Sequence, residues 1–343
     1  MKRIVVYLLK CALAAVISIV LLSLFSLVYY NPPIVIEQAD GITNSKFIPN
    51  YRWSFMLEGV GFGKTDSLGY NNAYYDDCTN PDIVFMGSSH LEGLQVSQKE
   101  NCVYVLNEKF DKDDLSYNDF KCLNLGTSGH FFGVSANNFK YVAEKFNGAK
   151  YIVIEVSEIK FSPSELDDII EGKFHQPMEK KGFIAETARK IPFIRLMYKK
   201  FNESSPADNN TSNEENVSTE ADEDLSVYSE KMNIVLAGIS EISKENGVIP
   251  IIVMHEQFWE ESDGSIVTIT DDKYNKAFEN CCDVNGIKLI DITPVMIENY
   301  KEKYEFSYGF SNTAPGEGHL NRNGHRIMAE TVYTHINEME AGK

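Results

Sequence analysis

Five short apolar runs, most of them closed by a glycine or polar residues, constrain the fold of this chain most strongly. They are PDIVFMG (81–87), KCLNLGTSG (121–129), AKYIVIEVS (149–157), VIPIIVMH (248–255) and IKLIDIT (287–293). Helical patterns lie between them at 135–146, 230–246 and 271–285, and a last helix is expected from 323 to about 339. Short apolar strands that alternate with helices are typical of a parallel sheet covered on both faces. We therefore predict an α/β fold.

The first 30 residues do not fit this pattern. An uncharged apolar run from Cys11 to Tyr30 follows Lys2, Arg3 and Lys10, and about 18 to 20 apolar residues are enough to cross a bilayer as a helix. The basic residues on its N-terminal side predict a cytoplasmic N-terminus and an exported remainder. A cleaved signal peptide is the alternative, but the run ends without a clear small-x-small cleavage site. We therefore expect a single-pass anchor in the cell membrane.

The rest of the chain divides into an extracytoplasmic lead-in at 31–80 and an α/β domain at 81–340. The lead-in is punctuated by prolines and glycines and is expected to hold short strands and turns. An insertion at about 160–227 interrupts the strand–helix alternation. Its segment 203–226 is acidic, rich in Asn, Ser and Thr, and has no Lys or Arg. Such a composition cannot bury enough apolar surface to order itself, so we predict a disordered loop.

Composition excludes several kinds of partner. The net charge of −18 over 343 residues argues against nucleic acid, whose phosphates would be repelled. No cluster of Cys and His has the spacing of a metal site, and we expect neither a metal nor another cofactor. Outside the cytosol some cysteines can pair, and Cys78 with Cys102 is the pair that we would expect first.

Two motifs at opposite ends of the exported part carry the candidate chemistry. DIVFMGSSHLEG (82–93) presents Ser89 at a tight turn after a strand, and GEGHLNRNGH (316–325) places His319 just before the last helix. Sites in open α/β folds lie at the carboxyl ends of the strands. There His319 could take the proton of the Ser89 hydroxyl, and Glu317 could orient the imidazole. The plainer alternatives are a serine that only caps a helix and a structural histidine.

In this order the motifs resemble those of the SGNH/GDSL hydrolases, over roughly residues 65–340. GSSHLEG resembles the block with the nucleophile, here Ser89, and NLGTSG (124–129) resembles the second block. The resemblance implies an oxyanion hole formed by the backbone NH groups of Ser89 and Gly129. GEGHLNRNGH resembles the last block of membrane-linked, polysaccharide-modifying relatives. The implied fold is a flavodoxin-like three-layer α/β/α sandwich with a mostly parallel sheet.

The chain departs from the family pattern at two blocks. Ser88 stands where the family has the aspartate of GDSL. The third block, normally GxND with an oxyanion-hole asparagine, is replaced by SEIKF, so that Ile159 falls near the expected asparagine. Removing one such donor from a working site costs on the order of 3 kcal/mol. Asn124, Ser128 and Asn137 are conceivable substitutes.

Several further side chains are expected near the same edge of the sheet. Each could line a substrate cleft or be merely structural. They are Ser88, His90, Asn124, His130 and His255. Glu155 lies inside a predicted strand and would need a buried partner, which the sequence does not identify.

The family resemblance implies hydrolysis or transfer of acyl esters, most often acetyl, on a cell-surface carbohydrate. It also implies a membrane acyltransferase as a partner. The principal alternative is a catalytically inactive subunit that binds glycan or assembles a cell-envelope polysaccharide complex. A lipid-directed esterase is a third reading, although the sequence shows no apolar lid segment.

Overall fold

The core of the molecule is a five-stranded parallel sheet, seen in a computed structural model that describes residues 2–37, 45–73, 80–112, 120–174, 190–203 and 225–342. Its strands are β6 (Ile83–Met86), β7 (Cys122–Asn124), β8 (Tyr151–Val156), β9 (Ile249–Met254) and β12 (Lys288–Asp291). They lie in the order β12-β9-β8-β6-β7, and every pairing is parallel. In chain order this is the 2-1-3-4-5 arrangement of flavodoxin-like folds, with its reversal point between β6 and β8.

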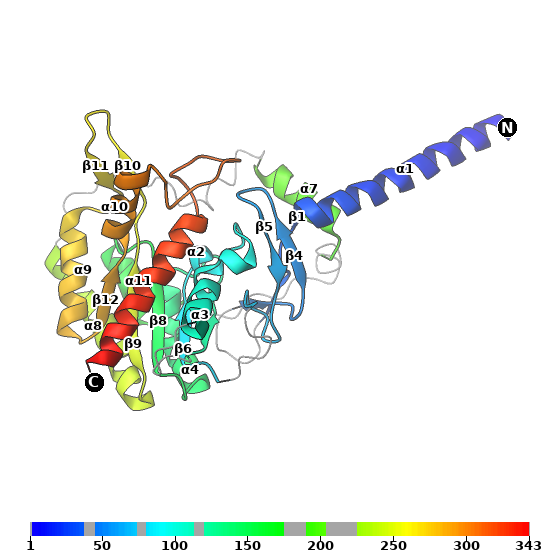
Figure 1. Ribbon diagram of the computed structural model, residues 1–343. Coiled ribbons are helices and arrows are strands. Elements are labelled where there is room, and N and C mark those ends of the chain that lie inside the picture. The colour runs from blue at the N-terminus through cyan, green and yellow to red at the C-terminus, as the bar shows by residue number, and fades with distance from the viewer. Residues whose placement is uncertain are drawn as a thin grey trace.

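Helices cover both faces of the sheet and make three layers (Figure 1). One face packs against α4 (Phe132–Lys145), α5 (Pro163–Ile170), α8 (Leu225–Asn246) and α9 (Asp272–Val284). The other face packs against α3 (Cys102–Lys112), α10 (Thr293–Lys303) and α11 (Arg322–Ala341). Alternate residues of each strand join opposite cores, as Val84 and Ile83 do, because successive side chains of a strand point to opposite faces. This is why the central strands are mostly apolar.

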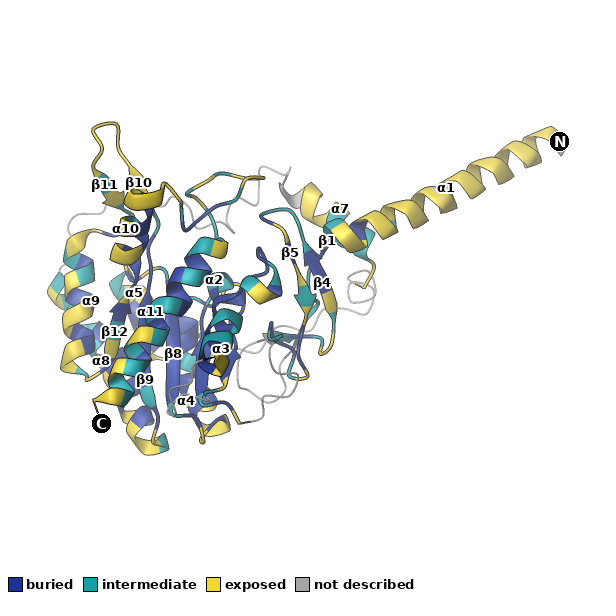
Figure 2. Ribbon diagram, viewed as in Figure 1, coloured by how far each residue is buried: buried dark blue, intermediate teal, exposed yellow. Residues whose placement is uncertain are grey.

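The N-terminal region lies outside this sandwich and consists of a long helix and a small antiparallel sheet. Helix α1 (Lys2–Tyr29) projects from the globular part, and it is long and apolar enough to cross a membrane (Figure 1). It leads into an antiparallel sheet of β1 (Tyr30–Asn31), β4 (Arg52–Phe55) and β5 (Gly61–Lys64). The surface of α1 is exposed except at its C-terminal end, where it meets this sheet (Figure 2).

Smaller elements complete the described part. They are the hairpin of β2 (Val35–Glu37) with β3 (Ser45–Phe47), the hairpin of β10 (Phe258–Glu260) with β11 (Ile266–Thr268), the one-turn α2 (Ser89–Glu92), η1 (Gln98–Glu100) and α7 (Pro192–Glu203).

The α/β class and the parallel sheet are confirmed, and each predicted strand and helix is present with small differences at its ends. The helices α3, α5, α7 and α10 were not predicted, because their short amphipathic patterns gave no clear signal beside the stronger strands. Most of the predicted disordered loop, residues 204–224, lies outside the described residues, as does Cys78. Cys102 is a buried free thiol, and burial raises its pKa.

Candidate active site

Ser89 lies on the turn that joins β6 to α2. Ser88 is the N-cap of α2 and accepts a hydrogen bond from the backbone NH of His90 through its hydroxyl, at 3.2 Å. Gly93 ends the helix after one turn in a left-handed conformation. The short helix therefore holds Ser89 at the carboxyl edge of the sheet, beside the reversal point of the strand order, as the sequence predicts.

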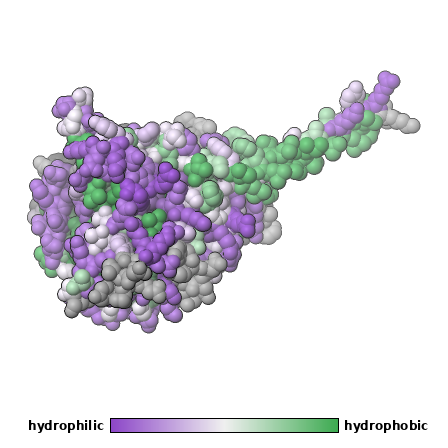
Figure 3. Space-filling view, in the orientation of Figure 1, coloured by the Kyte–Doolittle hydropathy of each residue, from purple (hydrophilic) through white to green (hydrophobic). Residues whose placement is uncertain are grey.

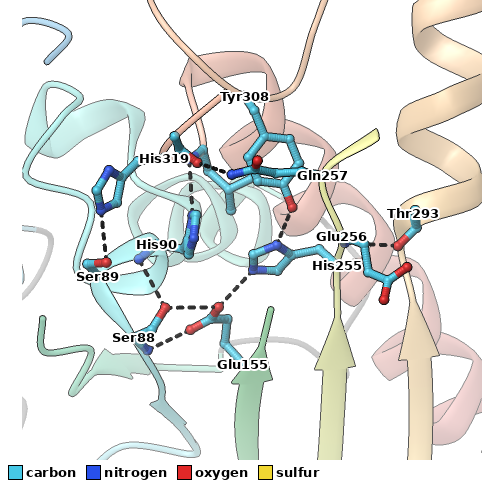
Figure 4. A network of polar contacts seen from close by, with 12 residues as sticks. Ser88, Ser89, His90, Glu155, His255, Glu256, Gln257, Thr293, Tyr308 and His319 are labelled. Carbon is cyan, nitrogen blue, oxygen red and sulfur yellow. Dashed lines mark hydrogen bonds and ion pairs between the residues drawn. The ribbon is translucent and has the colours of Figure 1, made fainter. Parts of the chain in front are cut away.

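His319 contacts Ser89, which lies 230 residues before it in the chain. Its Nε2 is 2.9 Å from the Ser89 Oγ (Figure 4). The position of His319 is set by the two residues that follow it: Leu320 pairs with Tyr308 in a β-bridge, and Asn321 caps the N-terminus of α11. The predicted pairing of Ser89 with His319 is thus present in the geometry.

The carboxylate beside His319 belongs to Glu58, not to the predicted Glu317. Glu58 Oε2 is 2.7 Å from the His319 Nδ1, and its Oε1 accepts the backbone NH of His319 at 2.9 Å. Glu317 is exposed, and its carboxylate makes no hydrogen bond to His319 in the described part of the chain. The prediction was wrong because residues two positions apart in a loop need not face one another, whereas Glu58 arrives from a different element.

Glycines allow Glu58 to reach this position from the turn between β4 and β5. A Cβ on Gly59 would overlap the carbonyl oxygen of Gln95, and one on Gly61 would overlap that of Leu94. A Cβ on Gly318 would likewise overlap the Glu58 carboxylate. The GVGFG run (59–63) next to an isolated acidic residue was therefore the available sequence signal, and it was interpreted only as punctuation.

Protonation of the three groups follows from their hydrogen bonds. A carboxylate can only accept, so His319 carries a proton on Nδ1 and presents Nε2 to accept from the Ser89 hydroxyl. Burial raises the pKa of Glu58, but the hydrogen bonds that Glu58 accepts from His319, together with the charge of Lys199, lower it by more. The net effect is a lowered pKa that keeps Glu58 ionised.

A second Glu–His pair lies on the opposite side of the nucleophile turn. Glu155 accepts hydrogen bonds from the Ser88 backbone NH at 2.6 Å and from the Ser88 hydroxyl at 3.2 Å. His255 Nε2 lies 2.8 Å from Glu155, and His255 Nδ1 lies 2.5 Å from the Tyr308 hydroxyl (Figure 4). A Cβ on Gly87 would overlap the Glu155 carboxylate, which explains the glycine before the two serines. These contacts supply the buried partner of Glu155 that the sequence did not identify.

His255 and His90 occupy different places at the sheet edge. His255 follows β9, as predicted, but it is fully buried and so cannot line an open cleft. His90 is partly exposed, and its ring centroid is 5.1 Å from those of both His319 and His255. Its enclosure, followed by the charges of the neighbouring histidines, lowers the pKa of His90. A neutral His90 adds no positive charge beside His319.

The loop after β7, which carries Gly129, is attached to α2 through Glu92. Glu92 is fully buried and accepts hydrogen bonds from both the backbone NH, at 3.2 Å, and the hydroxyl of Ser128. Burial raises the pKa of Glu92 to about 7, although these bonds oppose the shift. Neither the NH of Ser89 nor that of Gly129 is paired with an acceptor among the described residues. Both groups are therefore free to serve as the predicted oxyanion donors.

The proposed substitutes for the missing asparagine have other partners. Asn124 is fully buried, donates to the Leu91 carbonyl oxygen at 2.9 Å and accepts from Gly126. Asn137 bonds the Ile169 carbonyl oxygen and the Phe174 NH. Asn124 thus does not line a cleft, and neither amide is available as an oxyanion donor.

The other predicted residues near this edge are structural. Ile159 is fully buried in the core. His130 is buried, its ring makes no polar contact with Ser89 or His319, and burial lowers its pKa to about 4. Over the ranges that the structure describes, no group of three or more His, Cys, Asp or Glu side chains is arranged to hold a metal ion.

Comparisons with known proteins find distant structural likeness only. No protein-family model matches the chain, and no curated protein matches it. Solved structures that resemble it include an acetyl xylan esterase, with 12% identity, 74% of this chain and 98% of that one covered, and a TM-score of 0.41. A member of the lipolytic G-D-S-L family from Veillonella parvula has 13% identity, covers 74% of this chain and 96% of its own, and has a TM-score of 0.36. A GDSL-like lipase from Bacteroides thetaiotaomicron has 11% identity, 75% and 88% coverage, and a TM-score of 0.34. Of these three neighbours, the Veillonella parvula and Bacteroides thetaiotaomicron proteins carry a G-D-S-L name.

Proposed function

We propose that this chain is a membrane-anchored serine esterase or O-acyltransferase that acts on acyl esters, acetyl above all, of a cell-surface carbohydrate. One observation carries the proposal: a continuous hydrogen-bonded series from the Ser89 hydroxyl through the His319 imidazole to the Glu58 carboxylate. A nucleophile, a base and a group that orients the base are the three parts that acyl transfer through a serine requires.

The geometry suggests the order of the proton transfers. His319 Nε2 takes the proton of the Ser89 hydroxyl as the Ser89 Oγ forms a bond to the ester carbonyl carbon. The carbonyl oxygen becomes an oxyanion, which the NH groups of Ser89 and Gly129 would stabilise. His319 then gives its proton to the departing alcohol oxygen, and an acyl-serine remains.

The second half of the reaction reverses these roles. The acceptor hydroxyl loses its proton to His319, attacks the acyl-serine, and releases Ser89, which recovers the proton. Water as the acceptor gives hydrolysis, and a sugar hydroxyl gives acyl transfer. Glu58 stabilises the imidazolium that forms in each half.

Location supports a surface glycan as the substrate. Helix α1 is long and apolar enough to hold the domain at a membrane, where a growing cell-surface polymer emerges. An anchored enzyme would meet that polymer at high local concentration. A membrane acyltransferase that supplies acyl groups fits the same arrangement.

A test combines a fluorophosphonate probe with a small acetyl ester, applied to the full chain in detergent. Labelling at Ser89 and turnover that falls at least about 10³-fold in both Ser89→Ala and His319→Ala would support the proposal. Ser164→Ala, an exposed serine on α5, should behave like the parent protein. Adding an oligosaccharide and searching for its acetylated form by mass spectrometry separates transfer from hydrolysis.

The alternative function is a non-catalytic subunit that binds glycan. The buried Ile159 in place of an oxyanion asparagine favours it, because neither Asn124 nor Asn137 supplies the missing donor. A folded protein that neither labels nor turns over ester, yet retains glycan equally well as Ser89→Ala, would replace the first proposal with this one.

A further inference from the structure

Helix α7 (Pro192–Glu203) lies beside the point at which α1 enters the globular part. It packs against the C-terminal end of α1 and against β1 (Figure 1). The Arg195 side chain fixes this arrangement, because its guanidinium donates hydrogen bonds to the Asn31 side chain, the Pro32 carbonyl oxygen and the Tyr51 hydroxyl. The helix is therefore held against the exit of α1 by its polar side.

The outer side of α7 is apolar and exposed. Its residues recur at the i, i+3, i+4, i+7 spacing of one helix face. They are Ile194, Met197, Tyr198 and Phe201, with side chains between 38% and 68% exposed, and Ile191 extends the stripe by one turn at 41%. An apolar stripe of this size facing water is unfavourable unless something covers it.

The charge of α7 is also unusual for this protein. Lys199 and Lys200 lie on the side of the helix away from the apolar stripe, and α7 carries a third basic residue, Arg195, in a chain whose net charge is −18. A basic helix with one aromatic and aliphatic face is typical of helices that lie in the interface of an anionic bilayer. An acidic protein surface would attract the lysines, but it would not cover the apolar stripe of the same helix.

The length of α1 sets the level of α7 relative to a bilayer. The uncharged part of α1, from Cys11 to Tyr29, rises about 28 Å, which is close to the thickness of the hydrocarbon core. A helix of this length leaves its last turn at the membrane surface. This turn is already packed by the globular part: Ser26 is fully buried, and the Ser54 hydroxyl donates to the Leu27 carbonyl oxygen at 2.8 Å.

We propose that α7 lies in the outer interface of the bilayer, with the stripe of Ile194, Met197, Tyr198 and Phe201 among the acyl chains and Lys199 and Lys200 at the headgroups. The apolar surface of α1 continues to the place where it joins the globular part, so that the stripe extends an existing membrane-contacting surface (Figure 3). This inference rests on the proposed membrane anchoring, not on the proposed chemistry.

The consequence is a fixed position of the candidate active site above the membrane. A single transmembrane helix can tilt in the bilayer together with the domain, whereas a second contact at α7 restricts that tilt. The charge of Lys199 helps to lower the pKa of Glu58, so α7 also acts on the acidic member of the site. The site would then accept a substrate held close to the membrane surface.

The test measures lipid contact by fluorescence in the full chain, reconstituted into nanodiscs of phosphatidylcholine and phosphatidylglycerol. In a Trp259→Phe background, which removes the exposed tryptophan, Tyr198→Trp is compared with Val284→Trp. Val284 is similarly exposed, at 78%, but it lies on α9, on the side of the molecule remote from α1 (Figure 1). Leu21→Trp, on α1, reports whether the anchor is inserted.

Lipids brominated on the acyl chains should reduce the added emission of Tyr198→Trp at least about twofold, as for Leu21→Trp, and leave that of Val284→Trp unchanged. Quenching of Leu21→Trp without quenching of Tyr198→Trp would overturn the inference and leave the stripe to a protein partner. Absence of quenching at both positions would overturn it together with the anchoring. Fluorophosphonate labelling of Ser89 in the same samples reports on the proposed chemistry separately.

Discussion

In the described part of the chain, one Glu–His pair lies on each side of the Ser88–Ser89 turn, and the two pairs differ mainly in burial. The side chains of Glu58 and His319 are 19% and 29% exposed, and His319 contacts the Ser89 hydroxyl. Those of Glu155 and His255 are 1% and 0% exposed, and Glu155 contacts the Ser88 backbone. The same two residue types therefore form a partly exposed pair that contacts a serine hydroxyl on one side of the turn and a fully buried pair on the other.

The comparison shows that the environment, not the residue types, decides the role. A base that exchanges protons with a substrate must reach the substrate, which His319 can do and His255 cannot. Removing one member of a buried pair costs stability instead, because the other member is left in the core as a polar group without a partner. We infer that Glu155 and His255 are positioning residues that hold the turn on which Ser89 lies.

The largest expected effect separates Glu58 from Glu317. Glu58→Gln should lower kcat for a small acetyl ester on the order of 10³-fold, because an amide no longer stabilises the imidazolium and favours the wrong tautomer. The free energy of unfolding should change by less than about 1 kcal/mol, since the pair is partly exposed. Steady-state kinetics with Glu317→Gln as the matched control should show turnover within about twofold of the parent. A larger loss in Glu317→Gln than in Glu58→Gln would restore the original assignment.

In the buried pair, the same Glu-to-Gln substitution should lower the stability of the protein. Glu155→Gln should lower the free energy of unfolding by about 3 kcal/mol, because one carboxylate oxygen that accepts from Ser88 or His255 becomes a donor. Urea denaturation of the full chain in detergent, followed by near-ultraviolet circular dichroism, measures this loss. If Glu155→Gln were no less stable than Glu58→Gln, the proposed difference between the two pairs would be wrong.

Glu92 should make stability depend on pH. Its pKa is raised from 4.5 to about 7 in the folded protein, so the native state binds its proton more tightly than the unfolded state does. Stability should therefore fall as pH rises from about 4.5 to about 7, by up to about 3 kcal/mol, and this contribution should be constant above that range.

Glu92→Gln keeps the shape of the side chain and removes the titration. Denaturation midpoints across pH 4 to 8 should accordingly be flatter for Glu92→Gln than for the parent protein. An unchanged slope would show that another group causes the dependence.

The last prediction concerns how the turn with Glu58 is held. Gly59 and Gly286 have nearly the same backbone angle, with φ of 68° and 66°, but only at Gly59 would a Cβ meet other atoms. Gly286→Ala should cost about 1 kcal/mol for the left-handed conformation alone. Gly59→Ala should cost about 1 to 3 kcal/mol more, since the Gln95 backbone must shift, and it should also reduce ester turnover. Equal stability and equal turnover in the two variants would show that the turn has room to adjust.

Local patterns in the sequence were sufficient to predict the parallel sheet of this protein and to place Ser89 and His319 at its edge. Apolar runs of strand length that alternate with helices predicted the parallel sheet, and the glycine and serines after PDIVFMG placed Ser89 at its carboxyl edge. The histidine before the last helix was predicted for the same edge, and His319 does contact Ser89. These features depend on residues that are neighbours in the chain, and side-chain periodicity and turn chemistry report on them directly.

The tertiary structure alone decided which carboxylate serves which histidine. Glu58 meets His319 across 261 residues, and Glu155 meets His255 across 100. Such pairings depend on how the turn between β4 and β5 packs on Leu94 and Gln95 and on which strands lie side by side, and no local pattern encodes either. Glu317 was the nearest carboxylate in sequence, but the fold brings Glu58 to His319 because Gly59, Gly61 and Gly318 leave room for its approach.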